Sequence, residues 1–368
     1  MTTVPTIGTL PEVPGILTAE EVALTARSLV DLQLPNGMIP WFPGGHCDPW
    51  NHVESAMALS VCGYYAEAEA AYQWLADVQL SDGSWFNYYL EHSIEDSRLD
   101  TNVCGYIAAG LWHHALVTGD DSILERHFDM MEKAIGFVLR WQLPEGSIRW
   151  SLDAAGRIET YALLTGSSSL YHSLRCAVAI AERLGILRPE WELAAGRLGH
   201  AVAHHPGAFA PKNEFAMDWY YPMLSGALEG DAGCRRIQEH WDEFVMFGLG
   251  VRCVSTSDWV TAAETAECVM ALDALGMRDE ALELFEVAQG HRRPDGSYWT
   301  GLAYPDNVTF PNLETTSYTA AAIILAADAL SSTSAAAGLF RGETLEGTLD
   351  LAGPRCDSRH GGICQINR

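Results

Sequence analysis

Acidic and aromatic residues occur side by side at several points of this sequence. The segments are 48–54, 100–102, 218–221, 258–267 and 304–306. Trp and Tyr rings stack on the apolar faces of sugar rings, while Asp, Asn, Glu and His hydrogen-bond to sugar hydroxyls. The pattern therefore predicts a binding site for a neutral oligosaccharide or polysaccharide.

Three carboxyl residues, Glu54, Glu264 and Glu267, fall inside segments that are otherwise almost uncharged. A buried carboxylate without a partner is costly, so such residues usually line a polar cavity. Cleavage of a glycosidic bond needs one protonated carboxyl group and one ionised one. We predict Asp48 and Glu264 as this pair, with Glu264 as acid and Asp48 as base, or the two roles reversed.

The apolar neighbours Ala262, Ala263 and Val269 would raise the pKa of a carboxyl group on the same helix. Asp100, Glu267 and Glu54 are the next catalytic or supporting candidates. The predicted substrate-binding residues are Trp50, Asn51, His52, Trp85, Tyr88, Asn102, Trp219, Tyr220, Trp259, Trp299 and Tyr304. The prediction includes no metal and no cofactor.

Structural roles compete with these assignments. Asp48 before Pro49 suits a helix N-cap, and Asp100, Asp218 and Asp258 are each equally suited to capping. Thr261 and Glu264 have the spacing of a capping box. Any single Trp or Tyr is more often a core residue than a sugar platform.

Helical patterns that come in pairs must position these residues. The first of each pair is amphipathic and charged: 19–32, 66–78, 121–141, 190–203, 234–244 and 278–289. The second is rich in Ala, Gly, Ser and Cys: 50–62, 101–116, 168–184, 219–228, 259–275 and 314–330. Polar-faced helices that alternate with apolar ones indicate an outer ring around an inner ring. We predict an all-α (α/α)6-type toroid over residues 1–330, with at most short hairpins in loops. A C-terminal extension over 331–368 would wrap the barrel or be mobile.

The turns between helices repeat a Gln-Leu-x-x-Gly pattern at 33–37, 79–83 and 142–146, with a relative at 292–296. Aromatic segments follow each turn. The stretch from Tyr72 to Trp85 resembles the Gln-Trp repeat of the triterpene cyclases, in which the motif ties helix ends together. The Asp-x-Asp-Asp acid motif of cyclases is missing here, since the nearest string is Asp100-Thr101-Asn102.

The Asp48-Pro49-Trp50-Asn51 opening and the segment from Trp259 to Glu267 resemble those of α/α-barrel glycoside hydrolases. Within that group the resemblance is to the methylmannose-polysaccharide hydrolases, which are intracellular endo-acting α-mannosidases. It implies hydrolysis of internal α-1,4 bonds in a partly methylated mannan. We expect an inverting mechanism, with retention as the alternative: a separation of roughly 6.5–9.5 Å between the two carboxyl groups marks inversion, and about 5–5.5 Å marks retention.

Composition restricts the partners. The formal net charge of −26 argues against binding to nucleic acid or to an anionic membrane. The nine cysteines are scattered, and Cys62, Cys104, Cys176 and Cys268 fall in apolar helical patterns, as small buried hydrophobic residues do. With no export signal at the start, we predict a cytoplasmic protein. Cys356, His360 and Cys364 lack the spacing and the fourth ligand of a zinc site.

Three other functions share parts of this pattern. A terpenoid cyclase or prenyltransferase-like enzyme shares the toroid but would need a dense Asp cluster. A sugar epimerase would need two histidines in the lumen, for which His46, His52, His92 and His172 are the candidates. A non-catalytic glycan-binding protein would keep the aromatic residues without Asp48 and Glu264. The oligomeric state is left open.

Overall fold

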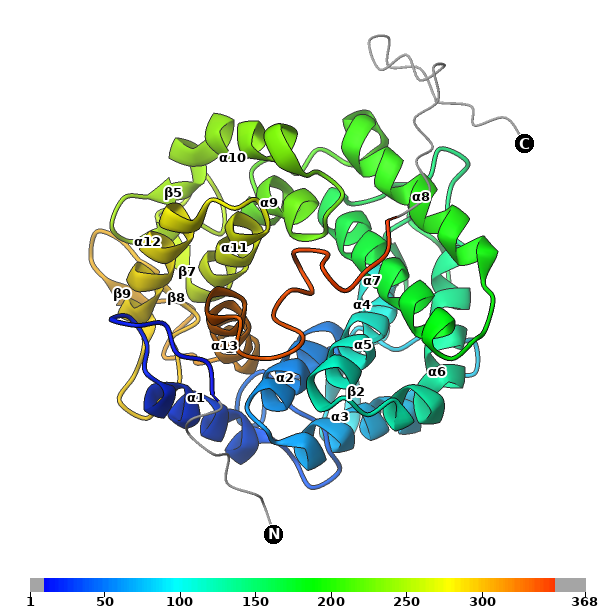
Figure 1. Cartoon of the computed structure of the whole chain (residues 1–368), viewed down its shortest axis with the longest axis horizontal. Coiled ribbons are helices and arrows are strands. Elements are labelled where there is room, and N and C mark those ends of the chain that lie inside the picture. The colour runs from blue at the N-terminus through cyan, green and yellow to red at the C-terminus, as the bar shows by residue number, and fades with distance from the viewer. Residues whose placement is uncertain (1–9, 348–368) are drawn as a thin grey trace.

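The computed structural model describes residues 10–347, and they form two concentric rings of helices (Figure 1). The inner ring contains α2 (Pro49–Val61), α4 (Thr101–Gly105), α5 (Ile107–Thr118), α7 (Leu164–Arg183), α9 (Ala216–Leu224), α11 (Ala262–Ala274) and α13 (Ser317–Ser331). The outer ring contains α1 (Ala19–Leu32), α3 (Tyr65–Val78), α6 (Ser122–Leu139), α8 (Pro189–His204), α10 (Gly230–Phe244) and α12 (Arg278–Ala288). This arrangement is the helical toroid that the alternating sequence pattern predicts.

The strands of the described residues are short and lie in the loops. They are β1 (Tyr88–Leu90), β2 (Ser93–Asp96), β3 (Leu99–Asp100), β4 (Ser151–Leu152), β5 (Val245–Met246), β6 (Gly250–Val251), β7 (Trp259–Thr261), β8 (Gly301–Ala303) and β9 (Val308–Thr309). All pair antiparallel, and β7, β8 and β9 form a three-stranded sheet in that order. Two short 3₁₀ helices, Pro206–Ala208 and Gln289–His291, lie between these elements.

The two rings differ because their helices meet different surroundings. The inner helix α13 is buried along nearly all its length and carries only one charged side chain, Asp328. The outer helix α6 buries one face and exposes charged residues such as Glu125 and Asp129 on the other. A helix enclosed by neighbours on all sides must be apolar around its whole circumference, whereas an outer helix needs only one apolar stripe.

The repeated Gln residues staple each turn to the next outer helix. The Nε2 amide of Gln33 donates to the carbonyl of Gly37 within its own turn and to the carbonyl of Glu67 on α3, both at 2.9 Å. Gln79 makes the same pair of bonds, to Gly83 at 3.0 Å and to Met130 on α6 at 2.9 Å. Gln142 repeats them further round the ring. The motif ties helix ends together, as the resemblance implies.

The fourth turn closes the ring between its first and last outer helices. Gly296 has a φ of +87°, and an added Cβ would lie 2.5 Å from the backbone carbon of Leu24 on α1. The hydroxyl of Thr25 donates to the carbonyl of Gly296 at 2.9 Å. Because this close contact leaves no room for a side chain, glycine is required where α12 and α1 meet.

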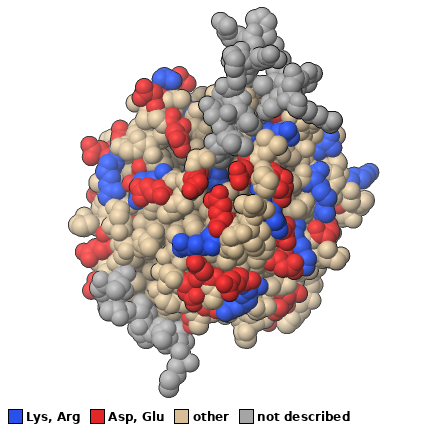
Figure 2. All heavy atoms as spheres, turned by 45° about the vertical axis from the view of Figure 1, so that its right-hand side comes forward, with Lys and Arg blue, Asp and Glu red and all other residues tan. Residues whose placement is uncertain are grey.

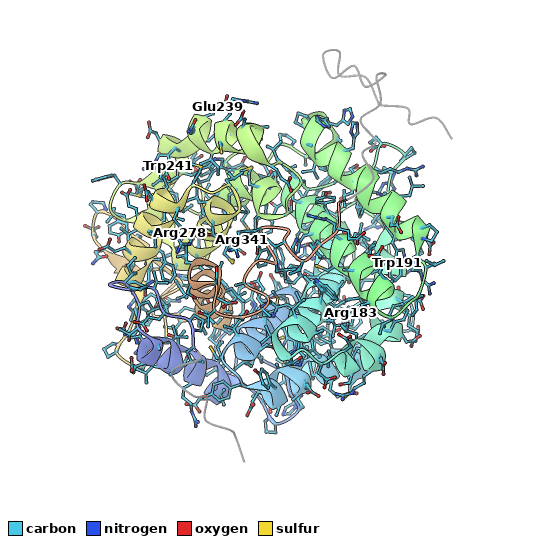
Figure 3. All side chains as sticks on the ribbon, in the orientation of Figure 1. Arg183, Trp191, Glu239, Trp241, Arg278 and Arg341 are labelled. Atoms are coloured by element: carbon cyan, nitrogen blue, oxygen red, sulfur yellow. The ribbon has the colours of Figure 1, made fainter. Side chains whose placement is uncertain are left out.

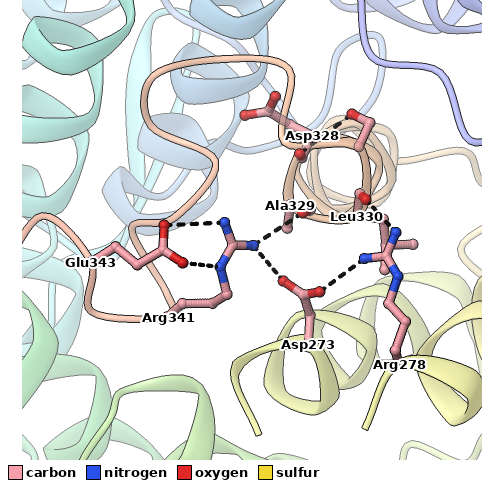
Figure 4. A network of polar contacts seen from close by, with 8 residues as sticks. Asp273, Arg278, Asp328, Ala329, Leu330, Arg341 and Glu343 are labelled. Carbon is pink, nitrogen blue, oxygen red and sulfur yellow. Dashed lines mark hydrogen bonds and ion pairs between the residues drawn. The ribbon is translucent and has the colours of Figure 1, made fainter. Parts of the chain in front are cut away.

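Residues 332–347 form a strap that crosses the centre of the toroid beyond α13 (Figure 1). Arg341 lies inside the ring, at the C-terminal ends of α11 and α13 and near Arg278 of α12 (Figure 3). Its guanidinium binds the buried carboxylate of Asp273 at 2.6 Å, and Arg278 binds the other oxygen of Asp273 at 3.0 Å (Figure 4). These contacts fasten residues 332–347 across one opening of the ring, while the remainder of the C-terminal segment, including Cys356, His360 and Cys364, lies outside the described residues.

Two predicted inner helices differ from the structure in kind, while the bounds of the other four are shifted by no more than four residues. The predicted helix over 101–116 is broken at Tyr106 into α4 and α5. The start of the predicted helix over 259–275 is instead strand β7, because Trp259, Val260 and Thr261 pair with β8. The helix α11 begins only at Ala262, which places Glu264 in its first turn.

The outer surface carries charges of both signs. On the face in Figure 2, acidic and basic side chains are interspersed over the outer helices. Within residues 10–347, no helix is long and apolar enough to cross a membrane. The seven cysteines of this range are free thiols, and Cys62, Cys104, Cys176 and Cys268 are buried as predicted.

Candidate active site

A cavity of about 320 Å³ opens at the rim where the inner helices begin. Its carboxyl residues lie on the inner helices α2 and α11, at the cap before α2, and on strand β3 before α4. The lining residues are Trp41, Asp48, Trp50, Asn51, Glu54, Asn87, Tyr88, Arg98, Asp100, Val103, Trp150, Met217, Ala263, Glu264, Glu267 and Tyr318. Of the residues predicted from sequence, the structure brings together here Asp48, Trp50, Asn51, Glu54, Tyr88, Asp100, Glu264 and Glu267.

Asp48 is both a helix cap and a cavity residue. Its Oδ1 accepts a hydrogen bond from the backbone N–H of Asn51 at 3.0 Å, as an N-cap of α2 does. Its Oδ2 accepts from the indole of Trp41 at 2.7 Å and from the Asn51 amide at 2.8 Å. Burial raises the pKa of the Asp48 carboxyl above its ordinary value, and these donated bonds offset part of the rise.

Asp100 repeats this arrangement on the next inner helix. Its Oδ1 accepts from the backbone N–H of Asn102 at 2.8 Å, so it caps α4. Its Oδ2 accepts from the indole of Trp150 at 2.5 Å. Burial raises the pKa of Asp100 to about 6. Capping therefore does not exclude a role in the cavity, since one oxygen caps and the other binds an indole.

Glu264 is the most exposed carboxyl group on α11 that faces the cavity. The hydroxyl of Thr261 donates to its Oε2, but Thr261 makes no side-chain bond to the helix backbone. The full capping box that the sequence allowed is therefore not formed. The bond from Thr261 therefore fixes the position of Glu264 Oε2, and the Glu264 side chain still lines the cavity.

Glu54 and Glu267 form the floor of the cavity. The indole of Trp50 donates to Glu54 Oε1 at 3.0 Å. Glu267 accepts from the phenols of Tyr220 and Tyr221, the latter at 2.8 Å. Burial raises the pKa of both carboxyl groups, that of Glu267 to about 7, and the charge of Glu267 raises that of Glu54 further. Such a pair favours at least one protonated carboxyl group at neutral pH.

A second, mainly apolar cavity lies below this floor and shares Glu54 and Glu267 with the first. The strap residue Phe340 lines it and stacks on His172, with ring centroids 5.0 Å apart. The two cavities therefore follow the lumen from the rim toward the strap.

Aromatic side chains make up much of the wall. Tyr88 stacks on His46 with centroids 4.3 Å apart, and Trp41 meets Tyr88 edge-on at 5.8 Å. Trp41 also packs edge-on against Tyr318 at 4.9 Å. Burial raises the pKa of Tyr88 to about 12, so its phenol stays protonated and can donate. These rings offer faces for stacking and edges for hydrogen bonds.

Three predicted binding residues have structural roles away from the cavity. His52 faces the outer ring, where Nδ1 accepts from the N–H of Ile39 at 3.1 Å and Nε2 lies 2.9 Å from the carbonyl of Ala71. Trp85 is fully buried and donates to the carbonyl of Leu75 at 2.8 Å. Trp219 stacks on Phe244 of α10. All three are buried and none lines the cavity, so the structure does not place them where they could contact substrate there.

The other predicted binding residues also lie outside the cavity lining. Tyr220 is buried and does not line the cavity, but its phenol donates a hydrogen bond to Glu267, which does. Asn102 is buried in α4. Trp259 lies in strand β7, and Tyr304 lies in the loop between β8 and β9. The ring of Trp299 lies 4.7 Å from the guanidinium carbon of Arg293.

Sequence reasoning missed several lining residues. Trp41 and Trp150, which bind Asp48 and Asp100, each follow one of the repeated turns, and this shared position was the available signal. Arg98 carries a positive charge into the cavity and is held at Asp96. Asn87, Val103, Met217, Ala263 and Tyr318 also line the cavity and were not predicted as site residues.

Of the four aspartates suited to capping, Asp48 and Asp100 cap their helices and the other two do not. Asp218 does not cap its own helix, because it lies inside α9 and accepts instead from the backbone N–H of Thr165 at 3.1 Å. Asp258 is exposed and pairs with Arg252 at 3.2 Å, so capping was wrong for it.

The histidines do not form the pair that an epimerase would need. Of the four candidates, only His172 lines either lumenal cavity, and it is covered by Phe340. His46 binds Glu95 at 2.8 Å, and His92 is exposed next to Glu91. Over residues 10–347, no group of three or more His, Cys, Asp or Glu side chains is arranged to hold a metal ion.

Comparisons with solved structures establish the fold. A glycosidase solved with glucose has a TM-score of 0.68 at 14% identity, covering 85% of this chain and 96% of its own. A D-mannose isomerase has a TM-score of 0.64 at 11% identity, covering 84% and 95%. An α-amylase from Clostridium perfringens has a TM-score of 0.60 at 10% identity, covering 83% and 97%. At these identities the similarity concerns the fold alone.

No known protein-family model matches the chain. A curated relative does: the chain is 50% identical over 347 residues to the MMP endo-(1,4)-3-O-methyl-α-D-mannosidase of Mycolicibacterium hassiacum. The alignment covers 93% of this chain and 96% of the relative. Since identity of this degree extends over nearly all of both chains, this protein is a glycoside hydrolase and belongs to the family of that endo-mannosidase.

Proposed function

We propose that the protein hydrolyses internal α-(1,4) bonds of a 3-O-methylated α-mannose chain. The observation that carries this proposal is the 50% identity to a relative that bears this activity in its name. A cavity that combines carboxyl groups with Trp and Tyr rings supports it, since both are needed for glycoside cleavage. The cytoplasm remains the predicted compartment.

We assign the fold within the glycosidases as an (α/α)6 toroid. The support is the alternation of inner and outer helices in the described range, with α4 and α5 taken together as one broken inner helix. The turn that joins α12 to α1 completes the cycle.

Asp48 and Glu264 are the proposed catalytic pair. Asp48 suits the general acid, because it is 4% exposed and burial raises its pKa, which favours the protonated form. Glu264 is more open to the cavity and suits the general base that activates water. This assignment is the second of the two role orders that the sequence left open. Asp100, with a pKa of about 6, is the rival acid.

The proposed reaction is a single displacement. The Asp48 carboxyl gives its proton to the glycosidic oxygen as the bond to the anomeric carbon breaks. Glu264 takes a proton from a water molecule, whose oxygen attacks that carbon from the opposite face. The products are two shorter chains, one with a new reducing end of inverted configuration. Asp48 caps the start of α2, and Glu264 lies in the first turn of α11. The helix α13 lies between α2 and α11, and this placement favours a gap between the two carboxyl groups that can hold water.

Two chemical rescues test the roles. Removal of a general acid is rescued by a substrate with a good leaving group, since that group needs no proton. Removal of a general base in an inverting enzyme is rescued by azide, which attacks without deprotonation. We expect Asp48→Asn to cleave an activated aryl mannoside far better than the natural linkage, and Glu264→Gln to form a glycosyl azide.

Asp218→Asn is a matched control, because Asp218 is buried near a helix start but does not line the cavity. It should keep its kcat on the natural linkage. If Asp100→Asn shows the leaving-group rescue and Asp48→Asn does not, Asp100 is the acid. If Asp48→Asn and Glu264→Gln both keep wild-type activity, the proposed pair is wrong.

A further inference from the structure

An apolar patch lies exposed on the loops before α13. Leu313 is 76% exposed, Val308 55% and Phe310 52%, and all three fall within six residues of one another. Trp259 of the neighbouring strand β7 packs edge-on against Phe310, with ring centroids 5.1 Å apart. Large apolar side chains gathered on a surface commonly mark a binding site.

The patch is held in a fixed position. The indole of Trp259 donates to the backbone carbonyl of Phe310 at 3.1 Å. Strand β8 pairs with β7 on one side and β9 on the other, with Ala303 opposite both Trp259 and Val308. A rigid surface loses little conformational entropy when a ligand binds, which favours a binding role.

The patch belongs to the same rim as the candidate active site. Strand β7 runs directly into α11, so Trp259 is five residues before Glu264. The loop after β9 runs into the start of α13, where Tyr318 lines the cavity. The two loops are tied together at Thr300, whose carbonyl accepts from Ala262 at 3.2 Å and whose N–H donates to Glu314 at 3.0 Å.

The size of the cavity requires further contacts for a polymer. About 320 Å³ is at the lower end of small-ligand pockets, which span roughly 300–1,000 Å³. A chain that is cut at an internal bond continues on both sides of the cut, so sugars beyond the cavity must lie on the rim. The side chains of the patch are uncharged and apolar, although the protein as a whole has a net charge of −26. An uncharged, apolar surface suits a neutral sugar chain that carries methyl groups.

We propose that Trp259, Val308, Phe310 and Leu313 form a distal binding site for the methylated sugars of the chain. The proposal rests on the proposed function and extends it from the cavity to the rim. The O-methyl groups would contact Phe310 and Leu313, so the patch would select methylated over unmethylated mannose.

The test measures binding and cleavage separately. Calorimetry on the Glu264→Gln protein compares a long and a short 3-O-methylmannose oligosaccharide, with and without Phe310→Ser. We expect Phe310→Ser to weaken binding of the long chain about fivefold, the scale of one aromatic contact, and to leave the short chain unchanged. It should also remove the preference for the methylated long chain over an unmethylated α-mannan of equal length.

Leu187→Ser is the matched control, because Leu187 is 84% exposed and follows the C-terminal end of α7, away from the rim where the inner helices begin. It should change neither affinity. Equal affinities with and without Phe310→Ser would overturn the proposal, as would a dimer that Phe310→Ser dissociates without changing sugar binding. If the wild-type protein binds the long chain through the patch but cleaves no bond, the proposed function fails while the distal site stands.

Discussion

Replacing Arg341 with Ala tests how the strap is fastened to the toroid. Arg341 Nη1 binds Asp273 at 2.6 Å and the carbonyl of Ala329 at 3.1 Å, while its Nε binds Glu343 at 2.7 Å (Figure 4). The side chain of Asp273 is only 8% exposed, so its charge depends on its partners. Arg278 would remain after the substitution, at 3.0 Å.

The expected loss follows from these contacts. A hydrogen bond to a charged group contributes about 1.5–3 kcal/mol, and the retained Arg278 limits the penalty at Asp273. We therefore expect the free energy of unfolding to fall by about 2 kcal/mol. With an unfolding entropy of about 2.1 cal/mol/K per residue, a 368-residue chain has about 0.8 kcal/mol/K, so Tm should fall by about 2.5 °C.

Calorimetry measures the Tm, and hydrogen exchange measures the opening of the strap, for example at the amide of Glu343, which donates to the carbonyl of Gly338 at 3.1 Å. Arg126→Ala is the control, because Arg126 and its partner Glu69 are both about half exposed and such pairs contribute under about 1 kcal/mol. The reasoning is refuted if both variants lose the same stability, or if Arg341→Ala leaves exchange in the strap unchanged.

Three further predictions concern the site and its surroundings. The pKa of Glu267 is raised from 4.5 to about 7 in the folded protein. As pH rises, the unfolded chain therefore loses this proton before the folded protein does, and the free energy of unfolding falls between about pH 4.5 and pH 7. Glu267→Gln should flatten that slope by up to about 3 kcal/mol in urea titrations across this range; an unchanged slope contradicts it. Trp41→Phe removes a hydrogen-bond donor that lowers the pKa of Asp48, so this pKa should rise in the variant. Because the general acid must be protonated, the alkaline limb of the kcat/KM profile should then move to higher pH. A shift of the acid limb instead would make Asp48 the base. His52→Ala should lower Tm by several degrees while KM stays unchanged, because His52 joins the rings and does not contact the cavity; a raised KM would return it to the site.

The parts of the fold that the sequence revealed depend on local chemistry. The Gln-to-Gly turns were visible because each turn is specified within five residues, as in 33–37 and 79–83. The indole bond from Trp41 to Asp48 was not visible, since it depends on how the chain bends across Pro43 and Gly44. A contact of this kind depends on the path of the folded chain, and the spacing of the two residues in the sequence does not predict it.

The error at His52 was avoidable. Successive helical residues turn by about 100°, so His52 and Glu54 point to nearly opposite sides of α2. Trp50 and Glu54, one turn apart, share the face toward the cavity and are hydrogen-bonded to each other. Once Glu54 is placed in the lumen, His52 must face the outer ring.

The strap changes what the toroid can do with a polymer. A ring that is open at both ends permits a chain to be threaded and held while it is cut repeatedly. Here residues 332–347 cross one opening, and Phe340 occupies the lumen below Glu54 and Glu267 (Figure 1). The toroid is therefore a cup and not a tube. In the proposed endo-hydrolysis, the polysaccharide would therefore enter through one mouth, and both fragments of each cut would leave on that same side.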